Sequence, residues 1–104
     1  MIILEKDEGV KINFELIGTD LHLGDAENEL VLALADLQQE WDEHITVFFD
    51  KKRTLTLNER KGRSYVAEID IPALTYMASE DNPEEAVPAP IDVNLVALTL
   101  WAIE

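Results

Sequence analysis

Residues 25–43, with the sequence DAENELVLALADLQQEWDE, are the part of the chain on which the predicted fold depends. Alanine and leucine, both strong helix formers, fill its middle, and Asp25 is typical of a helix N-cap. Glu27 and Glu29 suit the positive end of a helix dipole. On a helix, one core-facing arc about 100° wide would contain Ala26, Leu30, Ala33, Leu34, Leu37 and Trp41. The stretch therefore predicts one long helix with Trp41 as a core anchor.

Strand patterns flank this segment on both sides. Apolar and polar residues alternate in 10–17 and 64–71, which is typical of half-buried strands. A charged turn with a glycine separates residues 2–4 from 10–17 and predicts that the two pair as an N-terminal hairpin. We expect the apolar run 92–103 in the interior of the sheet, because an apolar edge strand invites aggregation. Two further predicted strands are 45–49 and 53–57.

These elements predict an α+β fold in the order β-β-α-β-β-β-β. An antiparallel sheet of five or six strands would carry one long helix on one face. The length of 104 residues corresponds to a single domain, 1–104, and the absence of cysteine excludes disulfides and thiolate metal sites. Residues 79–90 contain three of the four prolines and four acids, so we expect a mobile acidic loop there.

The sequence shows no pattern of a targeting or membrane segment. Charged residues begin at position 5, which leaves no room for the apolar part of a signal peptide. No run approaches the roughly 18 apolar residues that a membrane helix needs. We therefore expect a cytoplasmic protein.

Charge is unevenly distributed along the chain. There are 22 acidic and 8 basic side chains, for a net charge of −14. Most of the basic residues lie in 51–63, and they are Lys51, Lys52, Arg53, Arg60, Lys61 and Arg63. If two turns of a hairpin carry them, two basic spots roughly 17 Å apart result, rather than one compact patch.

Five acids would align along the outer face of the predicted helix: Asp25, Glu29, Asp36, Glu40 and Glu43. This ridge is either a solvated face or a surface complementary to a basic partner. Like charges at helical spacing cost a few tenths of a kcal/mol, which favours a use for the ridge. We predict these five acids as the partner-binding residues.

The middle of the predicted helix is apolar almost all round. Val31, Leu32 and Ala35 lie off the core-facing arc. Either the 79–90 loop covers this side, or a second copy of the chain does, in a homodimer.

The charge pattern favours three classes of function, in descending order. The first is a non-enzymatic interaction protein that binds a basic partner surface, of the inhibitor, immunity, DNA-mimic or chaperone type. Direct binding to nucleic acid is disfavoured, because phosphates repel a chain of net charge −14. The second is a structural, self-assembling subunit of a phage or complex, with acidic and basic surfaces meeting head to tail.

An enzyme that depends on carboxylates or a metal is the third class. The sequence contains no phosphate-binding glycine loop, nucleophile elbow or zinc-binding histidine motif. Possible metal ligands are Asp20, His22, Glu40 and His44, although His44 could instead satisfy the last carbonyls of the helix. Glu68 and Asp70 form a carboxylate pair on one strand face, opposite Tyr65, Ala67, Ile69 and Ile71. We predict no catalytic residue, cofactor or resident metal.

Overall fold

The computed structural model, which describes residues 1–104, is built mainly of β-strands. Strands take up 45% of the residues and helical segments 7%. The strands are β1 (Ile2–Glu5), β2 (Phe14–Ile17), β3 (Asp20–Asp25), β4 (Asn28–Ala33), β5 (Glu43–Phe49), β6 (Leu55–Thr56), β7 (Ser64–Ile71), β8 (Tyr76–Ala78), β9 (Ala86–Pro88) and β10 (Ala97–Leu100). The helical segments are α1 (Leu34–Leu37) and the 3-10 turn η1 (Val93–Leu95), and neither is long and apolar enough to cross a membrane. The predicted α+β fold, with a long helix packed on a sheet, is therefore wrong.

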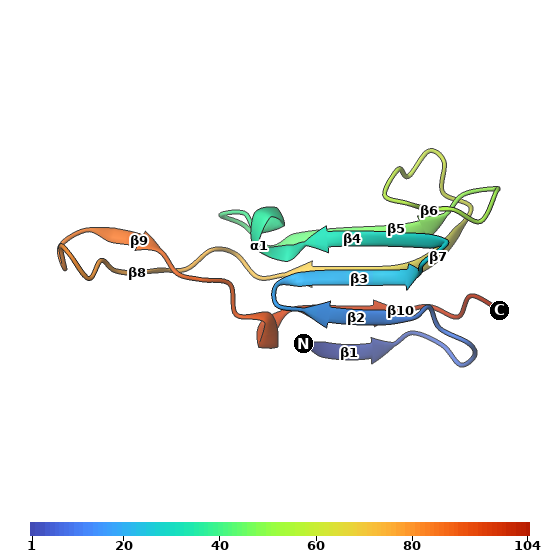
Figure 1. Ribbon diagram of the computed structural model, residues 1–104, viewed down its shortest axis with the longest axis horizontal. Helices are drawn as coiled ribbons and strands as arrows, with labels where there is room; N and C mark the ends of the chain where they lie inside the picture. The colour runs from blue at the N-terminus through green and yellow to red at the C-terminus, as the bar shows by residue number, and fades with distance from the viewer.

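The strands form two sheets and a separate two-stranded hairpin (Figure 1). The larger sheet has the order β1-β10-β7-β5-β6, and the smaller sheet has the order β2-β3-β4. Leu21 and Leu23 of the smaller sheet belong to the same buried cluster as Ile69 and Leu98 of the larger one, so the two sheets pack against each other. β8 and β9 pair only with each other and project from one end of the molecule. We call residues 76–88 the arm.

The segment 25–43 contains a hairpin turn, β4, α1 and the start of β5 instead of one helix. The Asp25 carboxylate does accept two backbone N–H groups, those of Glu27 and Asn28, at 3.0 and 3.1 Å, as an N-cap would. The same hydrogen bonds also close a tight turn. Gly24 lies next to this turn in β3: its φ is +93°, and a Cβ at this position would lie 2.0 Å from the Asn28 carbonyl oxygen. β3 and β4 therefore pair as a hairpin.

The side chains predicted to line one face of the helix do not share one environment. Leu34 is fully buried, whereas Trp41, predicted to be a core anchor, is 61% exposed. Burial in this region follows the two-residue period of a strand. Leu32 is paired with Leu21 across the hairpin and both are buried, while the neighbouring Val31 is exposed.

The strand predicted at 64–71 is confirmed as β7. Ala67 and Ile69 are buried and Asp70 is exposed, as the alternation predicted. Tyr65 was predicted on the buried face but is half exposed. A β-bulge opposite the Val47–Phe48 step of β5 changes the register and turns Tyr65 outward.

The C-terminal run 92–103 contributes η1 and β10. β10 lies between β1 and β7, so the predicted interior position is confirmed. The predicted N-terminal hairpin is wrong, because β1 pairs with β10 in parallel and β2 belongs to the smaller sheet. The turn after β1 binds the C-terminal segment instead: the Asp7 carboxylate accepts the backbone N–H of Ala102 at 2.6 Å.

The molecule is elongated and its core is small. Its extents are 52 × 25 × 24 Å, and 15 of the 104 residues are buried, all of them apolar. The radius of gyration is 15.8 Å, against roughly 13 Å for a typical domain of this length. The arm contributes to this difference, because it extends the molecule without adding a buried residue.

Alanine substitutions at Leu21 and Trp41 distinguish the β3–β4 hairpin of this structure from the long helix predicted for residues 25–43. Leu21→Ala should cost about 2 to 5 kcal/mol of unfolding free energy, because it leaves a cavity between the sheets. Trp41→Ala should cost less than about 1 kcal/mol, because the indole is exposed. Urea unfolding followed by circular dichroism measures both. A larger loss for Trp41→Ala than for Leu21→Ala would contradict this fold.

Candidate functional site

The end of the molecule that carries the arm has a large uncompensated negative charge. Residues 34–44 and 70–96 contain ten acidic side chains and no lysine or arginine. They form α1, the start of β5, the end of β7, the arm and η1, which lie toward the same end in Figure 1. The acids are Asp36, Glu40, Asp42, Glu43, Asp70, Glu80, Asp81, Glu84, Glu85 and Asp92. We call this region the acidic end.

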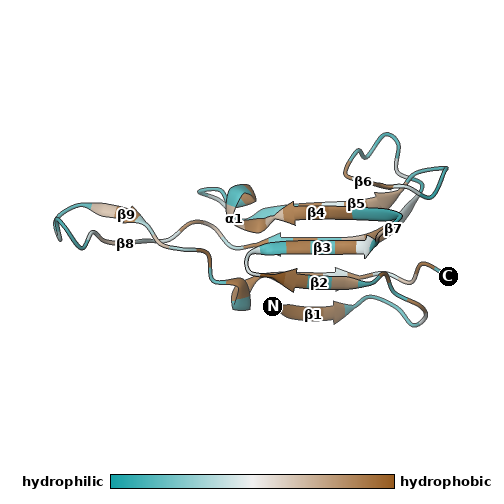
Figure 2. Ribbon diagram, viewed as in Figure 1, coloured by the Kyte–Doolittle hydropathy of each residue, from teal (hydrophilic) through white to brown (hydrophobic).

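The tip of the arm, residues 79–85, is a hydrogen-bonded turn and appears as a polar segment in Figure 2. The Ser79 N–H donates to the Glu85 carbonyl, and the Glu85 N–H donates to the Asn82 carbonyl, both at 2.9 Å. The tip carries four exposed carboxylates that form no ion pair: Glu80, Asp81, Glu84 and Glu85. The predicted loop 79–90 thus contains an ordered turn and β9, and its mobility stays a prediction.

Hydrogen bonds attach the base of the arm to the segment before β5. The Ala73 N–H donates to the Asp42 carboxylate at 2.9 Å, and the Leu74 N–H donates to the Gln39 carbonyl at 2.7 Å. The Tyr76 hydroxyl donates to the Glu40 carboxylate at 2.9 Å, and this hydrogen bond raises the pKa of Tyr76. Glu40 and Asp42 are therefore held beside the root of the arm.

On the outer face of the larger sheet, His44 of β5 lies between two carboxylates of β7. Its Nδ1 atom is 2.5 Å from Asp70 Oδ1, and its Nε2 atom is 3.3 Å from Glu68 Oε1. The hydrogen bond to Asp70 and the two negative charges raise the pKa of His44, although partial burial opposes this shift. Glu68 also accepts the Trp101 Nε1–H at 2.9 Å, and Trp101 stacks on Tyr65 with ring centroids 5.0 Å apart. The site can therefore hold a proton on His44 next to the acidic end.

The five acids predicted to form one ridge are divided between the two ends of the molecule. Asp25 and Glu29 flank the turn between β3 and β4, at the end opposite the arm (Figure 1). Asp36, Glu40 and Glu43 belong to the acidic end. A single rigid ridge is therefore wrong, because no helix aligns these five side chains.

The predicted dimer surface of Val31, Leu32 and Ala35 does not exist as one face. Leu32 is buried in the core, whereas Val31 points outward from β4. Ala35 lies in α1, beyond the end of that strand. These three residues therefore offer no shared surface to a second copy.

Five basic side chains line one open depression with a volume of about 300 Å³. They are Lys51, Lys52, Arg60, Lys61 and Arg63. We call this the basic depression. The prediction of two basic spots roughly 17 Å apart is wrong. β6 spans only Leu55–Thr56, so the chain turns back after two paired residues and brings both turns together.

Asp50 is the sixth residue that lines the basic depression. Its carboxylate accepts the backbone N–H groups of Thr54 at 2.9 Å and Lys52 at 2.8 Å. These hydrogen bonds, that of Thr54 first, and the charges of Lys52 and Lys61 lower the pKa of Asp50. The carboxylate therefore stays ionised and shapes the turn, while the five cations remain without a salt bridge.

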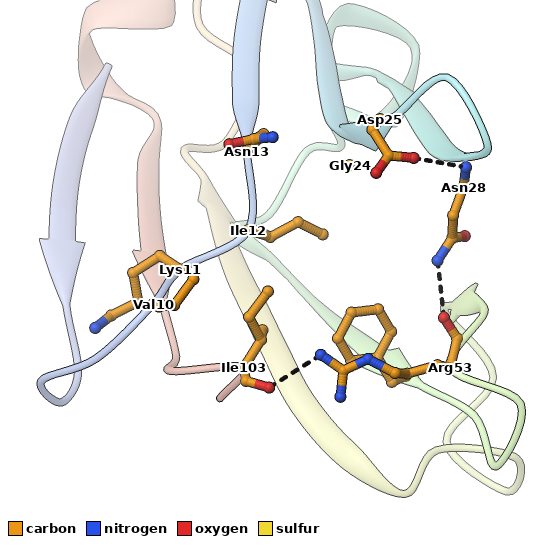
Figure 3. A pocket seen from close by; sticks show the side chains of 10 residues that line it. Val10, Lys11, Ile12, Asn13, Gly24, Asp25, Asn28, Arg53 and Ile103 are labelled. Atoms are coloured by element: carbon orange, nitrogen blue, oxygen red, sulfur yellow. Dashed lines mark hydrogen bonds between the residues drawn. The ribbon is translucent and has the colours of Figure 1, made fainter.

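Arg53, predicted to be part of the basic hairpin, lies outside the basic depression in a second pocket (Figure 3). Its guanidinium donates to the Ile103 carbonyl at 3.1 Å and lies 4.8 Å from the centre of the Phe49 ring. The Asn28 amide donates to the Arg53 carbonyl at 2.8 Å and accepts the Leu55 N–H at 3.2 Å. These hydrogen bonds and the contact with Phe49 attach the C-terminal segment and the β3–β4 hairpin to the larger sheet.

The residues considered as metal ligands are not brought together. His22 lies on β3, 3.6 Å from Glu29, whereas His44 lies on β5 and contacts other carboxylates. Glu40 accepts a hydrogen bond from Tyr76. No group of three or more histidine, aspartate or glutamate side chains is arranged to hold a metal ion.

Comparison with known proteins adds no assignment, since no family model, curated protein or solved structure matches this chain. Two surfaces stand out by their charge and geometry: the acidic end and the basic depression.

The arm tip was not among the predicted site residues. A signal for it exists in the sequence, because residues 70–96 contain six acids and no lysine or arginine. No comparable signal shows that residues 34–44 lie beside the root of the arm. That arrangement follows from the pairing of β5 with β7, in which Glu43 lies opposite Ile71.

The stability of the fold should depend on the protonation of His44. Its pKa in the folded chain is raised above the ordinary value of 6.5, so protonated His44 stabilises the folded state. This contribution is fully present below pH 6.5 and is lost as the pH rises through the raised pKa. The difference in unfolding free energy between wild type and His44→Gln should therefore shrink over that range. A difference that stays constant or grows with pH would contradict the contact, and His22→Gln serves as the control.

Asn28→Ala should destabilise the protein by about 1 to 3 kcal/mol, because it leaves the Arg53 carbonyl and the Leu55 N–H without their side-chain partner. Asn13→Ala is the matched control, since Asn13 lines the same pocket and its side chain makes no hydrogen bond. Urea unfolding measures both variants. Equal stability of the two would show that the Asn28 amide does not hold the sheets together.

Proposed function

We propose that this protein is a non-enzymatic interaction protein that binds a basic surface of a partner through its acidic end. The observation that carries this proposal is the projecting arm, whose four tip carboxylates are exposed and unpaired. Six further acids lie at the same end, with no lysine or arginine among them.

The physical basis of the proposal is electrostatic steering. A concentrated negative charge speeds the encounter with a cationic surface and disfavours partners of the same sign. The two backbone hydrogen bonds within the tip restrict its conformations, so less ordering is needed on binding than for an acidic tail without such bonds. The arm is thus suited to make the first contact with a cationic partner during association.

Neutralising the arm tip tests the proposal. The arm variant carries E80Q, D81N, E84Q and E85Q. The control variant removes the same number of charges from exposed acids outside the acidic end by E5Q, E8Q, E15Q and E27Q. Because both variants lose four negative charges, any difference between them reflects the position of the charges.

The readout is binding to a cationic partner that is isolated on the wild-type protein and then purified. Surface-based kinetics at low and moderate salt give the association rate for each variant. We expect the association rate of the arm variant at low salt to fall about tenfold, while that of the control variant falls much less. Equal rates for the two variants would reject the arm as the binding surface.

A further inference from the structure

The basic depression and the arm tip are complementary in charge. Five cations and one carboxylate give the lining of the depression a net charge of +4. The arm tip carries four carboxylates. Neither group is neutralised within the chain, because no salt bridge involves any of these side chains.

The two surfaces cannot meet within one molecule. The arm projects from one end, and the turns that form the basic depression lie at the opposite end (Figure 1). The longest dimension of the molecule is 52 Å, whereas charges are screened over about 8 Å at physiological ionic strength. Neither surface can therefore neutralise the other within one chain.

The arm also lacks support from its own chain. β8 and β9 pair only with each other, and a two-stranded hairpin is at best marginally stable in water. Tyr76 and Met77 on β8 are 52% and 46% exposed. The accessible surface of the protein is 6933 Å², against about 5,900 Å² for a typical monomer of its mass. The elongated shape with its projecting arm accounts for the excess, and the surface of the arm stays open to a partner.

We propose that the arm tip of one copy binds in the basic depression of a second copy, so that the chain assembles head to tail. This inference rests on the proposed function. It identifies the basic partner surface as the basic depression of a second copy of the chain. The screening length also explains how chains of net charge −14 can associate, since only the charges at the contact act strongly on each other.

The contact joins two different surfaces of the same chain. Every bound copy therefore still offers a free arm or a free basic depression. Heterologous contacts of this kind produce rings or open filaments. We therefore expect the mass of the wild-type protein at low salt to rise with concentration above the 11.8 kDa of one chain, and to return to that value at about 1 M salt, where screening acts within about 3 Å.

A charge-exchange experiment tests the contact directly. The reversed arm carries E80K, D81K, E84K and E85K. The reversed depression carries K51E, K52E, R60E, K61E and R63E. Each variant alone has arm and depression of the same sign and should remain a monomer. An equimolar mixture should regain association, because each variant then finds a surface of opposite charge.

Sedimentation velocity gives the mass, and circular dichroism confirms that each variant is folded. A control with four reversals outside both surfaces, E5K, E8K, E15K and E27K, should associate like the wild type. If the reversed arm does not fold, the neutral arm variant replaces it and should associate at least tenfold more weakly than the wild type.

Two results would overturn the inference. One is a wild-type protein that stays a monomer at low salt, and the other is an associating wild type whose exchange mixture stays monomeric. In either case the kinetics with a foreign cationic partner still decide the proposed function. Dependence on the arm there, without self-association, would retain the proposed function and reject the second copy as its partner.

Discussion

The side-chain amide of Asn28 joins the two sheets at the edge where they would otherwise separate. It lies at the start of β4 and pairs with the carbonyl of Arg53 and the N–H of Leu55, beside the edge strand β6. The buried core consists of 15 residues, so a polar bridge between sheets carries more weight here than in a larger domain. The same bridge contacts the turn at Arg53, where φ is +64°, and the Asp50 carboxylate shapes that turn from the other side. The amide thus links the contact between the sheets to the turn whose lysines line the basic depression.

The sequence supported the strands better than the element between them. Alternation over eight residues predicted β7 at its full length, whereas the same pattern at 10–17 predicted a strand of which only β2, Phe14–Ile17, forms. Asp25 has two interpretations, because a carboxylate that accepts the N–H groups of the next residues can either cap a helix or close a turn. The helix propensity of the alanines and leucines around it decided the prediction, whereas burial of Leu21 against Leu32 decides the structure. Helix propensity contributes only a small free energy per residue. The pairing of β3 with β4 and the packing of their buried leucines against the larger sheet override it.

The composition of the candidate site was visible in the sequence, but its arrangement was not. Lysine and arginine are visibly concentrated in residues 51–63, yet the short β6 that brings both turns into one depression has no distinct sequence pattern. The acids of the predicted ridge are exposed as expected, except that Glu43 is half-buried, yet they are divided between the ends because the chain reverses between Asp25 and Asn28. Charge can be counted along a chain, whereas its position in space depends on register and turn length.

The stability that His44 contributes and the size of the negative charge at the acidic end change in opposite directions with pH. A proton on His44 stabilises the fold through Asp70 and Glu68, and the same proton reduces the negative charge that the acidic end presents. A cationic partner bound nearby opposes that proton, and by linkage the proton opposes the partner to the same degree. The acids therefore repel one another in the free protein, and His44 relieves part of that repulsion from within. A basic surface placed against this end would relieve the same repulsion from outside, and this electrostatic gain is the physical basis of the proposed binding.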